Sequence, residues 1–330
     1  MSVPEYKASD SVDLAQVTDF SKLAKKSVIV TGGASGLGKS YATAFVHAGA
    51  FVTVADYDVK GGEQAVSELG SNAQFVKCDV RSWEDQVAVF ESAVSNSPSK
   101  GVDIVIANAG MNQEDDLFTL QDPSQPPVKP DLKVLDVNLI GPIYTAKLAI
   151  HYFRRQPDDD EHDRCLILKS SMAGYIDMPP YPQYNVSKFG VRGLMRTLRH
   201  GTWREGIRVN VVAPWYVVTP IISDLAVRFL ESKGVKFATK EDCASAMLSI
   251  ASMRDLNGKS DIYIYINLCR IKIHQSLTSN NIGKSFAIVP RALFGTGIID
   301  LGLDDYSDKD VLKELHDLIR IVSPTAMKEG

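Results

Sequence analysis

The chain alternates short runs of β-branched residues with longer helical patterns, and this alternation constrains its fold more than any other feature. The strand-like runs are SVIVTGG, FVTVAD, AQFVKCDV, VDIVIANAG, CLILKSS and IRVNVVAPWYV. Near-continuous Val and Ile runs separated by helices are typical of a parallel sheet with both faces covered. The sequence therefore predicts a doubly wound parallel α/β domain, in which ligands bind beyond the carboxyl ends of the strands.

The pattern predicts one domain over residues 25–303, because no Gly/Ser-rich linker or tandem repeat divides the chain. Residues 1–24 are predicted to form an N-terminal arm that precedes the first strand, and residues 304–330 a helical tail. The polar, acidic start MSVPEYKASDSVDLAQ is unlike a secretory signal or an amphipathic transit peptide.

Composition excludes several function classes. A net charge of −4 and a pI near 5.9 give no electrostatic reason to expect nucleic acid or an anionic membrane as a partner. No apolar run approaches the ~20 residues that a membrane span needs. The four cysteines are scattered, and no His or Cys spacing suits a metal site. We therefore expect a cytoplasmic protein with reduced thiols and no metal.

A glycine-rich turn follows the first strand-like run and opens the first helical pattern. In VIVTGGASGLGKS, the residues Gly32, Gly36 and Gly38 give T-G-x-x-x-G-x-G, related to the stricter dinucleotide motif G-x-G-x-x-G. Glycine permits a tight turn and a close approach of the backbone to a pyrophosphate, whose charge the helix N-terminus stabilises. The turn predicts a dinucleotide site, although a tight strand–helix connection would use the same glycines.

An acidic residue follows the glycine-rich turn at the sequence distance that a dinucleotide site requires. Asp56 ends the run FVTVAD, 18 residues after Gly38. A carboxylate there accepts hydrogen bonds from the adenosine ribose and repels a 2′-phosphate. No arginine adjoins Asp56, and Asp58 adds a second negative charge. These residues favour NAD over NADP, with NADP kept as the alternative; the simplest other interpretation is an exposed acid at a strand end.

The stretch YNVSK places Tyr184 and Lys188 four residues apart, and therefore on one face of a helix. A positive charge near a phenol favours the phenolate and lowers the phenol pKa. A tyrosine working as a base near pH 7 needs its pKa lowered from about 10, which corresponds to about 4 kcal/mol. The pair predicts an acid/base site, although an exposed polar helix face would show the same spacing.

Together, these motifs resemble those of the short-chain dehydrogenase/reductase family over residues 25–258 and 284–303. TGGASGLG is similar to the family's cofactor loop, and CDV is similar to the strand end that binds adenine in the family. NAG matches the family motif that borders the cofactor, and YNVSK matches the family's Tyr–Lys pair. FAIVPR and its context are similar to the fungal hydroxyprostaglandin-dehydrogenase-like branch. The resemblance implies a Rossmann-type fold and a homo-oligomer. The cofactor-binding residues that the resemblance and the motifs imply are Gly32, Ser35, Gly36, Leu37, Gly38, Asp56, Asp79, Val80, Asn108, Ala109, Tyr184, Lys188, Val217 and Thr219.

The resemblance also implies the catalytic residues. The family's serine lies thirteen positions before the tyrosine, which selects Ser171 over its neighbour Ser170. Tyr184 would then exchange a proton with the substrate oxygen while Ser171 holds that oxygen. Lys188 would also bind the nicotinamide ribose, and Asn138 would fix a water that relays protons from Lys188. A buried asparagine bonded to the backbone of a kinked helix is the alternative for Asn138.

The segment after the sixth strand departs from the family pattern. Trp215 stands where the family has glycine, whereas Val217 and Thr219 keep the positions that hold the nicotinamide carboxamide. Trp215 suggests an aromatic wall near the substrate. Residues 221–237 are expected to form a helical flap, and its apolar content favours a hydrophobic substrate, although a helix that faces the core would explain that content almost as well.

Residues 259–283 have no place in the family pattern. The tripeptide Gly-Lys-Ser occurs at 258–260 and again at 283–285, and deleting 259–283 gives the smooth passage LNGKSFAIVPR. We hypothesise that this segment is a translated retained intron or a gene-prediction error. The alternative is a genuine insertion containing a β-hairpin, which the alternation in DIYIYI would suit.

The sequence thus predicts an oxidoreductase that transfers a hydride between NAD(P) and a secondary alcohol or ketone of a hydrophobic small molecule. Two alternatives remain open at this stage. One is an NADPH-dependent ketoreductase of a secondary-metabolite pathway. The other is a dinucleotide-binding sensor without catalytic activity, against which the Ser171, Tyr184 and Lys188 set argues.

Overall fold

The computed structural model describes residues 19–113, 115–118, 120–157, 159, 162–176, 178, 181–253, 285–291 and 298–300. Most of the expected N-terminal arm, the segment 259–283 and the tail 304–330 lie outside this part of the chain. All the strand-like runs of the expected sheet lie within it.

A single eight-stranded sheet forms the centre of the described structure, with the strand order β3-β2-β1-β4-β5-β6-β7-β8. Its strands are β1 (Ser27–Thr31), β2 (Phe51–Asp56), β3 (Ala73–Lys77), β4 (Ile104–Ala107), β5 (Cys165–Lys169), β6 (Arg208–Pro214), β7 (Ser285–Ile288) and β8 (Ile298–Asp300). Every neighbouring pair is parallel except β7 and β8. The order reverses between β1 and β4, which places a crevice at the carboxyl ends of these strands. The predicted doubly wound Rossmann-type fold is confirmed.

The antiparallel strand β8 was not anticipated. Its register pairs Phe286 with Asp300 and Ile288 with Ile298. The connection between β7 and β8 is shorter than the dozen or more residues that a parallel crossover needs, so the chain returns antiparallel.

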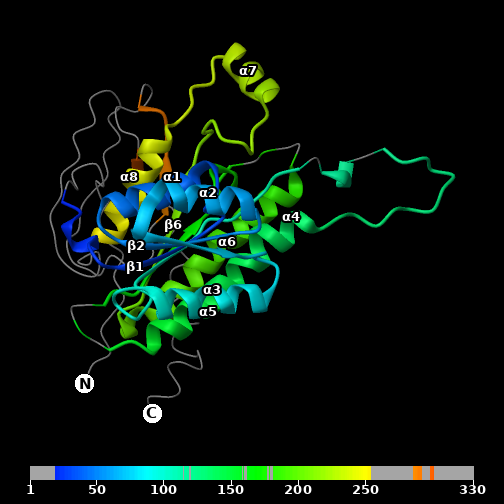
Figure 1. Ribbon diagram of the computed structural model, residues 1–330. Helices are drawn as coiled ribbons and strands as arrows, with labels where there is room; N and C mark the ends of the chain where they lie inside the picture. The colour runs from blue at the N-terminus through cyan, green and yellow to red at the C-terminus, as the bar shows by residue number, and fades with distance from the viewer. Residues whose placement is uncertain are drawn as a thin grey trace, which may run out of the picture.

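Helices cover both faces of the sheet (Figure 1). They are α1 (Gly36–His47), α2 (Val59–Leu69), α3 (Trp83–Asn96), α4 (Lys133–Leu135), α5 (Gly141–Arg154), α6 (Pro182–Thr202), α7 (Asp224–Ser232) and α8 (Lys240–Ser252). One apolar cluster joins the sheet to α1 and α8, with Phe45 and Met247 among its members. A second joins the opposite face to α3, α5 and α6, through Phe90, Phe153 and Met195.

Side-chain caps set where several helices begin. The oxygens of Ser82, Ser223 and Thr239 accept hydrogen bonds from the backbone three residues later, at 3.0–3.2 Å. Each cap satisfies one of the otherwise unpaired N–H groups of a helix start. The starts of α3, α7 and α8 are therefore encoded locally.

The sequence pattern through 132–153 suggests one helix, but the structure interrupts it. A π-helical turn over Asp136–Ile140 separates α4 from α5. Pro142 has no N–H to donate to the carbonyl four residues earlier, so the regular α-helical bonding fails at this point. The turn carries Asn138, which is fully buried.

Two outer segments bear on the predicted domain boundaries. Residues Ser21–Leu23 form a 3-10 turn, and Leu23 is buried against the core, so the last part of the expected arm packs on the domain. Helix α7 forms within the expected flap and buries none of its residues. Within the described residues, no helix is both long and apolar enough to cross a membrane.

Candidate active site

The glycine turn between β1 and α1 is built to bring backbone close to a ligand. Gly32 and Gly36 have φ angles of +64° and +54°, which favour glycine. A side chain at Gly38 would overlap the Gly32 carbonyl oxygen, so α1 can begin here only without one. Ser35 caps α1 in extended conformation, and its hydroxyl makes no capping bond. The turn thus presents the start of α1 toward the cavity.

Asn108, directly after β4, holds this turn through hydrogen bonds. Its Nδ2 donates to the carbonyls of Thr31 at 2.8 Å and Gly32 at 3.0 Å. Thr31 Oγ1 in turn accepts from the N–H groups of Asn108 and Ala109. The buried Oδ1 of Asn108 has no partner among the described residues and remains available to a ligand.

Asp56 ends β2 beside the glycine turn. Its carboxylate accepts from the backbone N–H groups of Ala34 at 3.0 Å and Asp58 at 3.1 Å. A carboxylate offers about four lone-pair sites, so these two bonds leave acceptor capacity for a ribose. Asp58 itself caps α2 by accepting from Gly61.

Asp79 and Val80 lie where β3 leaves the sheet, with an arginine that the sequence analysis did not include. Arg81 forms an ion pair with Asp79, with Nη2 to Oδ2 at 2.6 Å, and also donates through Nε. This partner lowers the pKa of Asp79. Arg81 lines the cavity, and its positive charge is already matched by Asp79.

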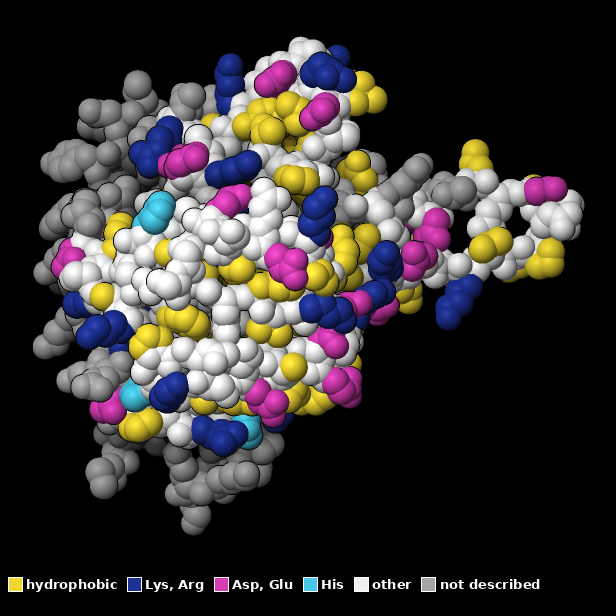
Figure 2. All heavy atoms as spheres, in the orientation of Figure 1, with side chains coloured by type: hydrophobic (Ala, Val, Ile, Leu, Met, Phe, Trp, Pro, Cys, Tyr) yellow, Lys and Arg dark blue, Asp and Glu magenta, His cyan; other side chains and the backbone are white. Residues whose placement is uncertain are grey.

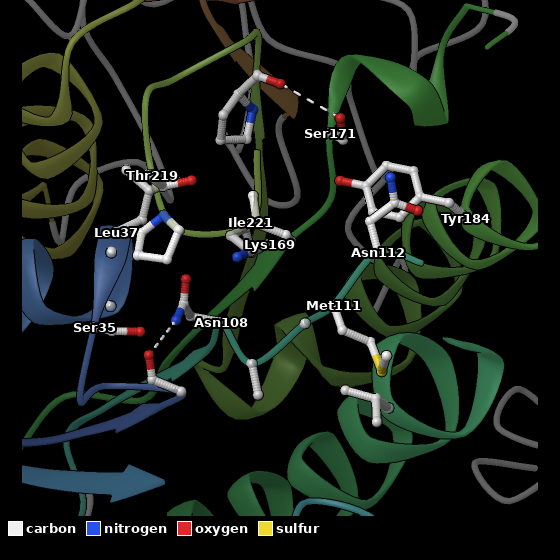
Figure 3. Close-up of a pocket in the computed structure, with 18 of the residues that line it drawn as sticks. Ser35, Leu37, Asn108, Met111, Asn112, Lys169, Ser171, Tyr184, Thr219 and Ile221 are labelled. Carbon is white, nitrogen blue, oxygen red and sulfur yellow. Dashed lines mark hydrogen bonds between the residues drawn. The ribbon is translucent and has the colours of Figure 1, made fainter. Parts of the chain in front are cut away.

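Tyr184 and Lys188 meet as the helical spacing predicts. Lys188 Nζ lies 5.3 Å from the centre of the Tyr184 ring and donates to the main-chain oxygen of Lys169 at 3.3 Å. Figure 3 shows the hydroxyls of Tyr184 and Ser171 directed into the same space. Ser170 instead donates to the Lys188 carbonyl at 2.9 Å and is buried, so it supports α6.

In the chain without ligand, the pKa of Tyr184 is raised and not lowered. In the chain by itself, burial raises the pKa of Tyr184, and the hydrogen bond with Ser171 only partly opposes it. Burial likewise lowers the pKa of Lys188, and the charge of Lys169 adds to the effect. In the chain without ligand burial therefore dominates the phenol pKa, and the lowering expected from Lys188 together with an oxidised nicotinamide stays a prediction.

Asn138 holds the loop after β4 through backbone bonds. Its Oδ1 accepts from Met111 N and its Nδ2 donates to Met111 O, both at 2.8 Å. This is the backbone-bonded role that the sequence left open as an alternative. A longer contact of 3.4 Å joins Nδ2 to Ser187 Oγ.

The loop after β6 closes one side of the site with aromatic residues. Trp215 Nε1 donates to Lys236 O at 3.1 Å, and Trp215, Tyr216 and Phe237 form edge-to-face contacts. Val217 bridges to Ala238, which ties this loop to the segment that returns from the flap. Above it, α7 exposes apolar side chains, visible at the top of Figure 2; Leu225 and Phe229 are 72% and 60% exposed.

These elements surround one cavity of about 600 Å³. Every predicted site residue lines it except Asn138 and Lys188, which lie behind its wall. The volume suits a small-molecule site. The residues present fit a dinucleotide, because the cavity runs from the side-chain-free glycine turn to the Ser171–Tyr184 pair and contains the free oxygen of Asn108. Among the described residues, no cluster of three or more His, Cys, Asp or Glu side chains could hold a metal.

Comparison with known proteins agrees with this geometry. The family model described as short chain dehydrogenase matches residues 26–227. The chain belongs to this family. It is 42% identical over 261 residues to 5'-hydroxyaverantin dehydrogenase of Dothistroma septosporum, an alignment that covers 73% of this chain and 85% of that protein. It is 32% identical over 281 residues to NADP-dependent dehydrogenase M3 of a Phoma species, covering 80% of this chain and 79% of that one.

A solved structure also resembles this short-chain dehydrogenase. A short-chain type dehydrogenase/reductase from Mycobacterium marinum superposes with a TM-score of 0.62 at 26% identity, over 72% of this chain and 92% of that one. Family membership makes the chain a short-chain alcohol dehydrogenase or reductase that uses NAD or NADP.

Lys169 is a further cavity residue that the sequence motifs did not identify. It ends the strand CLILK and lines the cavity, but no motif singled it out. A signal was present, because a lysine is rarely placed in an otherwise apolar run of a central strand.

Proposed function

We propose that this short-chain dehydrogenase oxidises a secondary alcohol of a hydrophobic small molecule with NAD as the hydride acceptor. The observation that supports it best is the convergence of the Ser171 and Tyr184 hydroxyls on the cavity that begins at the glycine turn. When bound, the dinucleotide supplies a nicotinamide ring that accepts or returns the hydride.

Each catalytic group has a defined task. Tyr184 Oη removes the hydroxyl proton of the alcohol, or returns it when a ketone is reduced. Ser171 Oγ donates to the substrate oxygen and fixes its position. The Lys188 ammonium, 5.3 Å from the tyrosine ring, stabilises the phenolate once burial is offset by the added positive charge of an oxidised nicotinamide. Asn138 holds the loop after β4 through Met111, and we retain the water relay through Asn138 as part of the proposal.

The substrate half of the cavity favours an apolar molecule. Its lining includes Met111, Met172, Met178, Trp215 and Tyr216. Met side chains adapt to irregular apolar ligands, and aromatic rings offer flat contact surfaces. The relative named for 5'-hydroxyaverantin supports a secondary-metabolite alcohol as the substrate class.

NAD is proposed because Asp56 and Asp58 both line the adenosine end of the cavity. Two carboxylates there disfavour a 2′-phosphate. The second candidate is an NADPH-dependent ketoreductase, which Arg81 on the same cavity and the NADP-dependent relative favour. Binding titrations with NAD and NADP separate the two. We expect tighter binding of NAD, and a strong preference for NADP would reverse the assignment.

Activity is tested by absorbance at 340 nm across a panel of hydrophobic secondary alcohols and ketones. Tyr184→Phe is expected to lower kcat by about 10²–10⁴, the usual contribution of general acid–base catalysis. Tyr181→Phe is the matched control, because Tyr181 lies one turn earlier and does not line the cavity. Dinucleotide binding without turnover of any substrate by the wild type would support the sensor alternative instead.

A further inference from the structure

Lys169 brings an amine into the active-site cavity, and the proposed mechanism gives its side chain no role. It is the last residue of β5 and pairs with Val212 of β6. Because side chains alternate along a strand, Lys169 lies on the same sheet face as Cys165 and Ile167, the face that α1 and α8 cover. The sheet itself therefore supplies this amine, whereas Tyr184 and Lys188 come from α6.

The amine is directed into the cavity and is not neutralised there. Its side chain is partly buried, and among the described residues it forms no hydrogen bond or ion pair through Nζ. In Figure 3 the amine of Lys169 lies between the Asn108 side of the cavity and the facing pair Ser171 and Tyr184. A lysine placed this way is available to interact with a ligand.

The groups that face Lys169 do not cancel its charge. Lys188 is a second amine, whose pKa is lowered by burial and by the charge of Lys169, and its Nζ donates to the main-chain oxygen of Lys169 at 3.3 Å. Cys243 of α8 stays neutral, because burial raises the pKa of its thiol to about 12. Tyr184 is neutral as well in the chain without ligand. Burial lowers the pKa of Lys169 to about 8, which leaves it mostly protonated at pH 7.

The acids of the cavity lie at its other end. Asp56, Asp58 and Asp79 follow β2 and β3, and the strand order places β1 and β4 between β2 and β5. The catalytic end therefore carries two amines and, among its described lining residues, no carboxylate. In a partly dry cavity such charges act more strongly than they would in water.

The two redox states of the cofactor differ in charge, so the amines at the catalytic end bear on them differently. In the proposed reaction Ser171 and Tyr184 act on the oxygen of the carbon that exchanges the hydride, so a bound nicotinamide ring would lie close to them. The oxidised ring carries one positive charge and the reduced ring none. We infer that Lys169 is an electrostatic selector that weakens binding of the oxidised dinucleotide relative to the reduced one. This inference rests on the proposed function and adds a redox preference to it.

The consequence concerns the direction of hydride transfer on the enzyme. Destabilising the oxidised dinucleotide relative to the reduced one makes it a stronger hydride acceptor when bound. Lys169 thereby favours alcohol oxidation within the complex and retention of the reduced cofactor afterwards.

The experiment measures dissociation constants of NAD⁺ and NADH by titration calorimetry and protein fluorescence, for the full chain at pH 7. Lys169→Met removes the charge and keeps much of the volume. We expect it to tighten NAD⁺ binding about tenfold and to change NADH binding by less than about threefold. Lys169→Arg keeps the charge and is expected to keep the wild-type ratio. Lys169→Gln is a second uncharged variant in case Lys169→Met does not fold.

Lys133→Met is the matched control, because Lys133 also lines the cavity but is exposed to water, which screens its charge. An equal loss of both affinities in Lys169→Met would show that the amine binds the phosphates common to both cofactors, and would overturn the inference. Unchanged affinities, or the same ratio change in Lys133→Met, would overturn it too. A wild type that binds neither NAD nor NADP in either redox state would instead contradict the proposed function.

Discussion

The side chain of Asn138 and the backbone of Met111 form a two-bond pair, in which Oδ1 accepts from Met111 N and Nδ2 donates to Met111 O, both at 2.8 Å. The pair joins the π-helical turn to the loop that follows β4, 27 residues away along the chain. It therefore fixes the loop that follows Asn108, from which Met111 lines the cavity.

Asn138→Ala should destabilise the protein, because it removes both bonds that the fully buried Asn138 side chain makes to the partly buried backbone of Met111. We expect the free energy of unfolding to fall by about 2–3 kcal/mol in urea denaturation. Ser187→Ala is the control, since it removes only the 3.4 Å contact with Asn138 and a local bond to Tyr184 O. Equal stability of Asn138→Ala and the wild type would show that the pair contributes nothing to the fold.

A Gly→Ala substitution should weaken dinucleotide binding at Gly38 but stabilise the protein at Gly193. Gly38→Ala places a methyl group against the Gly32 carbonyl and the Asn108 amide, so the turn must shift. Dinucleotide binding is expected to fall by at least tenfold, since the turn can no longer keep this geometry. The measurement is a titration of NAD into each variant.

Gly193→Ala provides the matched control within α6. Nothing lies within 4 Å of a methyl group at Gly193, and its φ is not in the left-handed region. Alanine is a better helix former than glycine, so stability should rise by about 0.5–1 kcal/mol with unchanged NAD affinity. Normal NAD binding by Gly38→Ala would mean that this turn does not hold the cofactor.

The sequence predicted those parts of the molecule that short-range patterns encode. The alternation of apolar runs and helices predicted the sheet, and the glycine spacing predicted the turn at Gly38. The antiparallel β8, the π-helical turn and the position of Lys169 depend on how distant segments pack, which local periodicity does not report. The rise that burial causes in the pKa of Tyr184 without ligand was not part of the expectation, because the degree of burial is a property of the folded cavity.

Tyr184 should titrate only at high pH in the protein without cofactor. Burial raises its pKa above the ordinary value of 10, so most of the phenol keeps its proton below pH 10. The chain has 12 tyrosines, so the difference in 295 nm absorbance between wild type and Tyr184→Phe isolates this residue. The midpoint of the Tyr184 signal is expected above pH 10.

The same titration with saturating NAD⁺ tests the electrostatic part of the mechanism. The added positive charge favours phenolate, so the apparent pKa should fall below its cofactor-free value. NADH is the control, because its ring is neutral, and it should produce a smaller change. A cofactor-free pKa below 10 would contradict the dominance of burial at this site.

Arg208 and Asp163 form a buried ion pair at the opposite end of the sheet from the cavity. Arg208 Nη2 lies 2.7 Å from Asp163 Oδ2 and also donates to Ala251 O, while Nη1 donates to Ile250 O at 2.9 Å. The guanidinium therefore binds the carboxylate and the last carbonyls of α8 at once. The side chains of the pair are only 2% and 9% exposed.

Arg208→Met should lower the free energy of unfolding by about 3–5 kcal/mol, because it removes the guanidinium that pairs with the buried Asp163 carboxylate and donates to the α8 carbonyls. The exposed pair Arg154–Glu205 has similarly short distances, from 2.6 to 2.7 Å, and serves as the control. Arg154→Met should cost less than about 1 kcal/mol, since water screens and solvates both partners. Urea denaturation measures both variants, and the double variant Arg208→Met/Asp163→Asn should recover part of the loss because the unpaired charge is gone. Equal losses for Arg208→Met and Arg154→Met would show that burial does not determine the contribution of this pair.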